Sequence, residues 1–318
     1  MPLNKFNFLF FLIFSSIFFY SYFFFPHHNS ADQLHYRKAF EAVKSIPFFD
    51  ALKIYRDHIH SDELIHFFLI WITSSIGISK NIVMSFANAL LATLFAMLLK
   101  QKNASVSLIF FLTISSYYLQ VLFFDLERLK FAFIFLFLYL LYLRRWLIIP
   151  AIFSHVFIII PIILSFLSRN IFMQKDLTSK LSSKKSLFSL QYTFILFVIC
   201  ITTIMFLWTH IIHKLEAYLA IYEGNRILET WKLAIFYIAT WITCFNKKSV
   251  FFYFFNLVLL ASLIGDSRIN MLGYFGFLYF SNFKNRNFMY LIFFFILYFF
   301  FKSVDYIYDS YNFGVTFN

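Results

Sequence analysis

The sequence has few of the residues that soluble enzymes use for tight turns, disulfides and nucleotide binding. Its 318 residues include 6 Gly, 5 Pro and 2 Cys, and 13% of them are charged. So few glycines argue against a glycine-rich phosphate loop, and the chain contains no Walker or Rossmann pattern. The cysteines, Cys200 and Cys244, give no basis for a disulfide framework or a zinc site. We therefore expect chemistry that needs neither a nucleotide nor a metal ion.

Acidic residues are also scarce. The chain has 15 Asp and Glu against 27 Lys and Arg, which gives a net charge of +12. No basic stripe with interleaved aromatic residues stands outside the apolar stretches, so we expect no nucleic-acid partner. Excess Lys and Arg are typical of the cytoplasmic loops of membrane proteins.

Apolar residues, by contrast, dominate. They make up 61% of the chain, with 52 Phe and 20 Tyr, and the mean hydropathy is +0.76. A soluble domain of this length cannot bury so much apolar side chain. The composition therefore predicts an all-α, polytopic helical membrane protein embedded in a lipid bilayer.

The apolar stretches predict about 10 to 11 transmembrane or re-entrant helices. They lie at about 6–25, 64–79, 81–99, 105–124, 128–143, 146–167, 190–209, 231–245, 249–264, 269–281 and 287–301. Several are short for a full crossing, and we find no internal repeat. Residues 1–318 are interpreted as one membrane domain, with external loops at 26–63 and 210–230.

The 26–63 loop has helical periodicity. Tyr36, Phe40 and Val43 recur at i, i+4 and i+7, and Pro47 ends that pattern. A second apolar stripe follows over residues 48–59. Two short amphipathic helices at the membrane interface are one interpretation, and an ordinary amphipathic loop is the other.

The basic residues leave the orientation open. If every apolar stretch crosses, Lys5 lies in the cytoplasm, Lys100 and Arg144 lie outside, and Arg128 lies inside. Two non-crossing segments, one within 64–99 and one within 146–189, would place all the short basic loops inside and Arg128 outside. Charge counting does not choose between these arrangements.

Ionisable residues in apolar surroundings are candidate functional residues, because burying a charge in lipid is costly. His155 lies in an apolar run, either as a neutral histidine bonded to Ser154 or to a backbone carbonyl, or as a proton acceptor or phosphate contact in a polar cavity. Arg128, in "FFDLERLKFAF", is either a basic flank of a span or a guanidinium clamp for a lipid diphosphate. Arg268, between Gly265 and Gly273, either pairs with Asp266 in a turn or stands at a broken helix end.

The 210–230 loop reads "HIIHKLEAYLAIYEGNR" and offers His210, Tyr218, Tyr222 and Arg226 as contacts for a sugar. Its histidine spacing is too loose to predict a metal site. In the first loop, Asp32 lies one helical turn before Tyr36 and could contribute in the same way.

Several of these residues stand in an order that resembles the EpsG-like, Wzy-type polysaccharide polymerases, which join O-antigen, capsule or exopolysaccharide repeat units. The matching positions are Asp32 with Tyr36, Glu63, Arg128 with Ala132, His155, and Arg268 with Tyr274. Leu129 stands where that family often has Gln. The resemblance covers most of the chain.

The resemblance implies a glycosyltransferase in the bacterial inner membrane. Its substrate would be an undecaprenyl-type, polyprenyl-diphosphate-linked oligosaccharide, and a chain-length regulator protein is an expected partner. Arg128 and Arg268 would bind the diphosphate, and His155 would act as a base or phosphate contact. Asp32, Tyr36, Glu63, Tyr274 and the 210–230 helix would bind substrate.

Three other functions remain open at this point. A polyprenyl-phosphate-sugar glycosyltransferase would use an acidic residue of the first outer loop, for which Asp32, Asp62 and Glu63 are available. A flippase or transporter of the same lipid-linked glycans is a second alternative, although the chain shows no internal repeat. A structural membrane protein is the third.

Overall fold

The computed structural model describes residues 5–29, 31–61, 63–155, 158, 226–244, 246–264, 268–281, 283 and 286–314. These residues form α-helices, one short 3-10 helix and connecting turns, so the predicted all-helical class is confirmed. The α-helices are α1 (Lys5–Phe24), α2 (Ala31–Ala42), α3 (Phe48–Ile59), α4 (Leu64–Ile76), α5 (Lys80–Gln101), α6 (Val106–Ile114), α7 (Tyr117–Phe124), α8 (Glu127–Tyr142), α9 (Ile148–Ser154), α13 (Arg226–Thr243), α14 (Lys247–Ile264), α15 (Arg268–Phe280) and α16 (Arg286–Phe313). The predicted apolar stretch at 190–209 and residues 210–225 of the predicted 210–230 loop lie outside the described residues, whereas residues 226–230 begin α13.

Three of the described helices are long and apolar enough to cross a membrane, within Lys5–Phe24, Lys80–Gln101 and Phe288–Phe313. A fourth candidate is the pair α6 and α7, which is bent by 51°. The predicted span at 105–124 is therefore two helices rather than one. The predicted stretch at 64–79 holds only the 13-residue helix α4, which at about 1.5 Å per residue is too short for a bilayer of about 30 Å.

Local sequence explains several helix ends. Pro47 occupies the N-cap of α3, and Gly77 adopts a left-handed conformation at the C-cap of α4. The hydroxyl of Ser105 accepts a hydrogen bond from the Leu108 N–H at the start of α6. These are the proline, glycine and serine positions that commonly begin and end helices.

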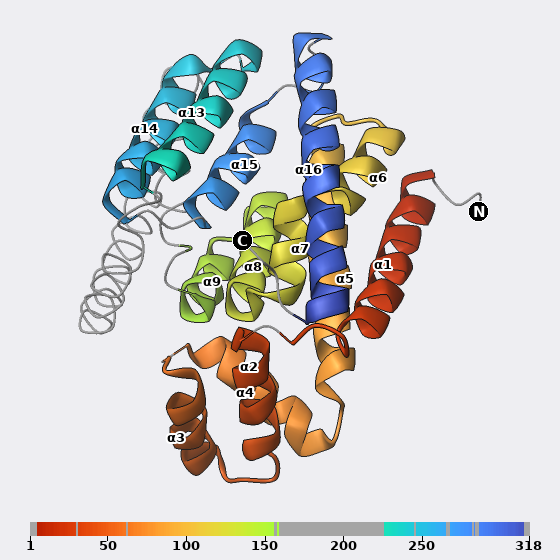
Figure 1. Ribbon diagram of the computed structural model, residues 1–318, viewed down its shortest axis with the longest axis vertical. Coiled ribbons are helices and arrows are strands. Elements are labelled where there is room, and N and C mark those ends of the chain that lie inside the picture. The colour runs from red at the N-terminus through yellow and green to blue at the C-terminus, as the bar shows by residue number, and fades with distance from the viewer. Residues whose placement is uncertain are drawn as a thin grey trace, which may run out of the picture. The chain divides into compact units, whose positions relative to one another are not determined.

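The chain forms two compact units, residues 1–158 with 283–318, and residues 159–282. In the first unit, α1 packs along α5, α5 packs on α8, and α8 packs on α9. Figure 1 shows α2, α3 and α4 gathered below the long helices of this unit. Small buried residues such as Ala89, Ala92 and Ala96 let neighbouring helices approach α5 closely.

The apolar stripe of α2 faces protein. Tyr36, Phe40 and Val43, predicted to share one helix face, are all buried. Tyr55 of α3 is also fully buried, whereas Phe49 is 82% exposed. The two helices at 31–59 thus form where the periodicity predicts them, and their apolar sides pack against each other and against α4.

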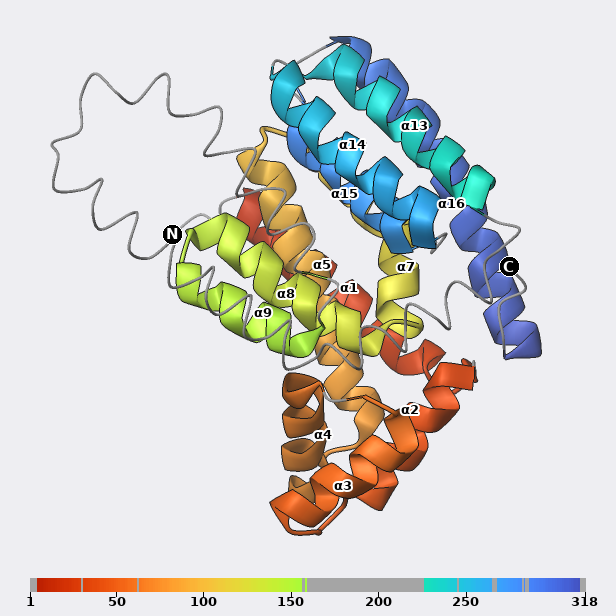
Figure 2. The same cartoon turned by 90° about the vertical axis from the view of Figure 1, so that its left-hand side faces the viewer.

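The second unit contains α13, α14 and α15, which lie side by side in Figure 2. Gly273 and Gly276 bring α15 close to its neighbours: a Cβ at Gly273 would overlap Leu233, and one at Gly276 would overlap the Tyr253 ring. The Tyr253 hydroxyl donates a hydrogen bond to the Leu272 carbonyl at 3.0 Å. Close backbone approach at small residues is a usual way for helices to pack in membranes.

Candidate functional site

The stretch "FFDLERLKFAF" contains the end of α7, a turn at Asp125 and Leu126, and the start of α8. Glu127 and Lys130 are fully buried, and the Arg128 side chain keeps only 15% of its surface exposed. These charges therefore do not form an exposed loop. Buried charges require partners, so their contacts define the candidate site.

Arg128 is held by two residues from distant parts of the sequence. Its Nη1 lies 2.7 Å from Oε2 of Glu63, which precedes α4. Its Nε donates a hydrogen bond of 3.0 Å to the hydroxyl of Tyr36 on α2. Within the described residues, Nη2 has no ion-pair or hydrogen-bond partner, so this part of the guanidinium remains available for an oxyanion.

Glu63 joins Arg128 to His155. The other carboxylate oxygen of Glu63, Oε1, lies 3.7 Å from Nε2 of His155. His155 follows the last residue of α9 in an extended conformation. Ser154 donates instead to the Pro150 carbonyl.

A second set of contacts centres on Glu127. Its Oε1 lies 2.7 Å from Nζ of Lys80, at the start of α5, and its Oε2 lies 3.4 Å from Nε2 of His66 on α4. Nδ1 of the same histidine lies 2.8 Å from the Tyr55 hydroxyl. The His66 ring also meets the edge of the Tyr36 ring, with centroids 5.3 Å apart, so the two sets adjoin.

We call these residues the charged cluster. Its members come from five helices and two connecting segments: Tyr36, Tyr55, Glu63, His66, Lys80, Glu127, Arg128 and His155.

At the border of the cluster, the ammonium groups of Lys130 and Lys80 donate further hydrogen bonds. Lys130 donates to the Phe123 carbonyl at 2.7 Å. Lys80 donates to Oε1 of Gln33 at 2.9 Å, and the amide of Gln33 donates to the Phe124 carbonyl. The last turn of α7 is thereby fixed to α2, α5 and α8. A network in which the buried charges are paired is rigid, because each broken contact would expose an unpaired charge.

Burial also fixes the protonation of the two phenols. It raises the pKa of Tyr36 to about 12, although the positive charge of Arg128 opposes the shift. Burial likewise raises the pKa of Tyr55 well above its ordinary value. Both hydroxyls therefore stay neutral at physiological pH and act as hydrogen-bond partners.

Asp125 connects the same turn to the C-terminal helix. Its Oδ1 lies 2.7 Å from Nε2 of His28, and its Oδ2 accepts a hydrogen bond of 2.8 Å from the hydroxyl of Tyr306 on α16. The Asn29 N–H donates to the Gly314 carbonyl at 2.7 Å. The C-terminal end of α16 thus lies at the same end of the first unit as the charged cluster.

The opposite end of this unit is basic. Nζ of Lys100 lies 4.4 Å from the ring centroid of Phe6, and Gln101 donates to the Leu141 carbonyl, so the start of α1 and the ends of α5 and α8 meet there. The basic residues in or next to these segments and at the start of α16 are Lys5, Lys100, Lys102, Arg144, Arg145 and Arg286. Residues 1–31, 64–124, 128–158 and 283–304 contain no Asp or Glu.

The structure brings together four of the predicted site residues: Tyr36, Glu63, Arg128 and His155. Asp32 is exposed at the start of α2, one turn before Tyr36. Arg268 and Tyr274 belong to α15 in the second unit, where Tyr274 is buried. The candidates His210, Tyr218 and Tyr222 lie outside the described residues, and Arg226 is described only as the first residue of α13.

Sequence reasoning missed four members of the charged cluster: Tyr55, His66, Lys80 and Glu127. His66 could have been found by the rule that singled out His155, because it also stands in an apolar run. Lys80 begins a long apolar stretch and has no basic neighbour in the sequence, which is unusual for an orientation signal. Tyr55 has no such signal, since it is one of 20 tyrosines.

The comparisons with known proteins give no match to a family model, to a curated protein or to a solved structure. Within the described residues, no group of three His, Cys, Asp or Glu side chains is placed to hold a metal ion. The arrangement that remains is a buried guanidinium held by a carboxylate and a phenol, with a histidine on the same carboxylate. It is suited to binding an oxyanion and to accepting a proton.

Proposed function

We propose that this protein is a membrane glycosyltransferase that polymerises polyprenyl-diphosphate-linked oligosaccharide repeat units. The observation that carries the proposal is the convergence of Tyr36, Glu63, Arg128 and His155 on one buried cluster. These residues are up to 119 positions apart in the chain, and all four stand at positions that the resemblance singles out. A buried arginine needs partners in any fold, and here Tyr36 and Glu63, with His155 beside Glu63, are positions that the resemblance also singles out.

In the proposed reaction, a hydroxyl oxygen at the non-reducing end of the acceptor glycan bonds to the anomeric carbon of the donor. The bond between that carbon and the diphosphate oxygen breaks, and its electron pair leaves with the polyprenyl diphosphate. His155 accepts the hydroxyl proton, and Glu63 stabilises the resulting imidazolium. Arg128 offsets the charge of the leaving diphosphate. The activated substrate supplies the driving force, so the step requires neither a nucleotide nor a metal ion.

Glu63 and Tyr36 orient the guanidinium in this scheme. A planar guanidinium binds phosphate oxygens best when its fork is held in one direction. The contacts of Nη1 and Nε with these two residues hold the guanidinium in one orientation. Asp32 and the 210–230 segment are proposed to bind the acceptor sugar, and Arg268 to assist with the diphosphate.

The distribution of charge supports a cluster at the outer face of a bacterial inner membrane. Short loops rich in Lys and Arg stay in the cytoplasm. The basic end of the first unit has such loops without any acidic residue, whereas Asp125 and Glu127 lie at the other end. The shortness of α4 supports a non-crossing segment within 64–99, the arrangement in which the basic loops of the first unit lie in the cytoplasm and Arg128 lies outside.

The decisive test is the conservative substitution Arg128→Lys in a strain whose own copy of the gene is deleted. Lysine keeps the charge but loses the planar fork. We expect surface polysaccharide to shorten to single repeat units while the amount of protein in the membrane stays unchanged. Arg56→Lys, at an exposed position of α3, is the matched control and should leave the polymer at wild-type length.

Normal polymer length with Arg128→Lys would contradict the proposal. Loss of all surface glycan, including single repeat units, would indicate a flippase. Loss of one sugar from each repeat unit would indicate a polyprenyl-phosphate-sugar glycosyltransferase.

The orientation is tested separately by cysteine labelling, with Cys200 and Cys244 first replaced by serine. We expect a membrane-impermeant maleimide to label Phe49→Cys, on exposed α3, in intact cells. Lys102→Cys, at the basic end, should react only after the membrane is permeabilised. The reverse labelling pattern would place the charged cluster on the cytoplasmic side and would contradict the proposal that the reaction takes place at the outer face.

A further inference from the structure

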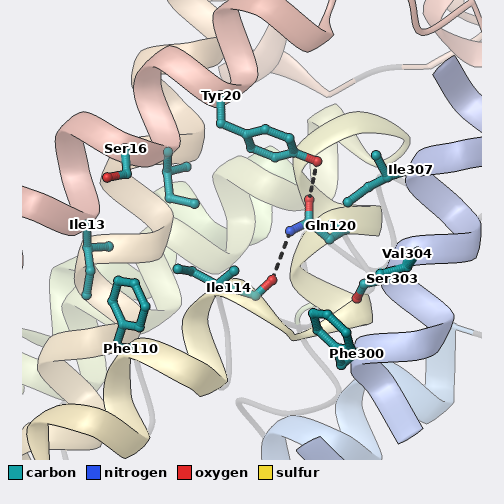
Figure 3. Close-up of a pocket in the computed structure, with 11 residues that line it drawn as sticks. Ile13, Ser16, Tyr20, Phe110, Ile114, Gln120, Phe300, Ser303, Val304 and Ile307 are labelled. Atoms are coloured by element: carbon teal, nitrogen blue, oxygen red, sulfur yellow. Dashed lines mark hydrogen bonds between the residues drawn. The ribbon is translucent and has the colours of Figure 1, made fainter. Parts of the chain in front are cut away.

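The first unit contains a cavity of about 210 Å³ among α1, α6, α7 and α16. Figure 3 shows its lining: Ile13 and Phe110 lie on one side, Phe300 and Val304 on the other, and Tyr20 with Gln120 between them. Seven of its eleven lining residues are Ile, Val or Phe. None of them belongs to the charged cluster.

The cavity lies beside the bend between α6 and α7. The bend interrupts the backbone hydrogen bonds of a candidate span, and two side chains satisfy the carbonyls that it releases. Gln120 donates to the Ile114 carbonyl at 3.3 Å, and Ser303 of α16 donates to the Ser115 carbonyl at 3.1 Å. Tyr20 donates to the side-chain oxygen of Gln120 at 3.1 Å, as the dashed line in Figure 3 shows.

These hydrogen bonds pair the polar side chains of Tyr20, Gln120 and Ser303 with protein groups. The remaining wall is apolar, so a polar ligand would lose its bonds to water and find few partners here. An apolar cavity of about 150 Å³ can remain free of water and bind benzene. This one is larger, and it is therefore suited to an apolar organic group.

The position of the cavity identifies the kind of apolar group. All four of its helices belong to candidate membrane spans. Along α1 the lining runs from Ile13 to Tyr20, about 12 to 22 Å from the start of that helix, which is the depth of the hydrocarbon layer. Ile114, Phe300 and Val304 are each at least 40% exposed, so the cavity opens outward at this depth. The molecules available there are the chains of membrane lipids.

We infer that this cavity binds one hydrocarbon chain of a membrane lipid, held between α1 and α16 beside the bend. The head group lies toward the end of the unit that carries the charged cluster, because Tyr306, next to the lining residue Ile307, donates there to Asp125. The two helices pack on α6 and α7, respectively, and their ends meet through Asn29 and Gly314. A hydrocarbon chain between α1 and α16 completes the packing around the bent pair α6 and α7. The inference does not require the proposed glycosyl transfer.

The test uses the full-length protein in vesicles of phosphatidylethanolamine and phosphatidylglycerol. Each preparation carries one photoreactive probe with a diazirine in its chain, either a phosphatidylglycerol or a polyprenyl phosphate, and cross-links are mapped by peptide mass spectrometry. We expect Ile17 and Phe300 to be labelled more than about tenfold above Phe293, which is 63% exposed and does not line the cavity. This ratio corresponds to about 1.4 kcal/mol of preference.

Ser16→Trp fills the cavity from α1, and Val304→Trp fills it from α16. Both should reduce labelling of the cavity to the level at Phe293. Phe19→Trp and Phe301→Trp, which are exposed on the same helices and do not line the cavity, are the matched controls and should leave labelling unchanged. Because the cavity is filled from two different helices, the test still gives a result if one of the two variants fails to fold.

Labelling by the polyprenyl probe would support the inference and assign the chain to the proposed substrate. Labelling by the phosphatidylglycerol probe alone would also support the inference, and it would identify the bound molecule as a structural membrane phospholipid rather than the proposed substrate. Labelling at Ile17 and Phe300 no greater than at Phe293, with both probes, would overturn it. None of these outcomes depends on polymer formation, so failure of the proposed function is recognised separately by the Arg128→Lys polysaccharide assay.

Discussion

The two compact units hold their helices together in different ways. In the first unit, buried charged and polar side chains from α2, α4, α5, α8 and the residue before α4 contact one another around Glu127 and Arg128. In the second, α13, α14 and α15 meet through close packing at Gly273 and Gly276, and the buried carboxylate of Glu229 is bonded to Lys232 and Asn270. Among its described residues the second unit thus pairs one buried carboxylate, whereas the first unit joins several buried charges from different helices in one network. That network is why we propose the functional site in the first unit.

The largest effect is expected from removing the acid at the centre of the first unit. Glu127→Leu leaves Lys80 buried without its carboxylate and should cost about 3 to 5 kcal/mol of stability. The thermal unfolding midpoint of the detergent-purified protein measures this loss.

The double variant Glu127→Leu/Lys80→Met removes both charges and should recover most of that stability, because no unpaired charge remains. If the double variant is as unstable as the single one, charge pairing is not what fixes the helices of the first unit.

A smaller effect is expected from enlarging a glycine in the second unit. Gly276→Ala places a methyl group against the Tyr253 ring, which is tethered by its bond to the Leu272 carbonyl. Overpacking of this kind costs about 1 to 3 kcal/mol. Thermal unfolding is again the measurement, and the polysaccharide assay should show polymer of normal length.

A double-mutant cycle with Tyr253→Leu provides the control. Because the two changes affect one contact, the smaller side chain should relieve part of the cost of Gly276→Ala. Strictly additive losses would mean that the close approach at Gly276 does not hold this unit together.

The smallest effect is expected from Tyr36→Phe, which removes one hydrogen bond from Arg128 and leaves its pairing with Glu63 in place. The folded protein should lose about 1 kcal/mol of stability at pH 7. Tyr308→Phe, at an exposed position of α16, is the control. An equal change in both variants would show that the phenol does not support the guanidinium.

The same variant carries a pH signature. The pKa of Tyr36 is about 12 in the folded protein, against an ordinary value of 10.0. Between these values the folded state keeps a proton that the unfolded state loses, so stability falls as the pH rises. Unfolding midpoints should therefore fall more steeply from pH 10 to 12 in the wild type than in Tyr36→Phe, and parallel curves would contradict the burial of this hydroxyl.

Much of the helix pattern could be predicted from the sequence. The bounds of α1, α5, α8 and α14 agree with the apolar stretches to within a few residues. A helix in lipid must satisfy its own backbone hydrogen bonds, and α1 and α5 are long enough to cross the bilayer. Pro47, predicted to end the first apolar pattern, follows the end of α2 and is the N-cap of α3. The bend at Ser115 and Ser116 was not predicted, since Ser303, which stabilises it, lies far away in the chain.

The sequence by itself determined that this chain is helical and apolar enough for a membrane, and it pointed to Arg128, Glu63, Tyr36 and His155 as individual residues. Only the tertiary structure decided that "FFDLERLKFAF" is a buried turn, and that Arg128 lies between Glu63 and Tyr36 while Glu127 lies between Lys80 and His66. The reason is physical. Periodicity and length record how a segment relates to its solvent, whereas the pairing of buried charges depends on which segments meet, and that is settled by packing across the whole unit.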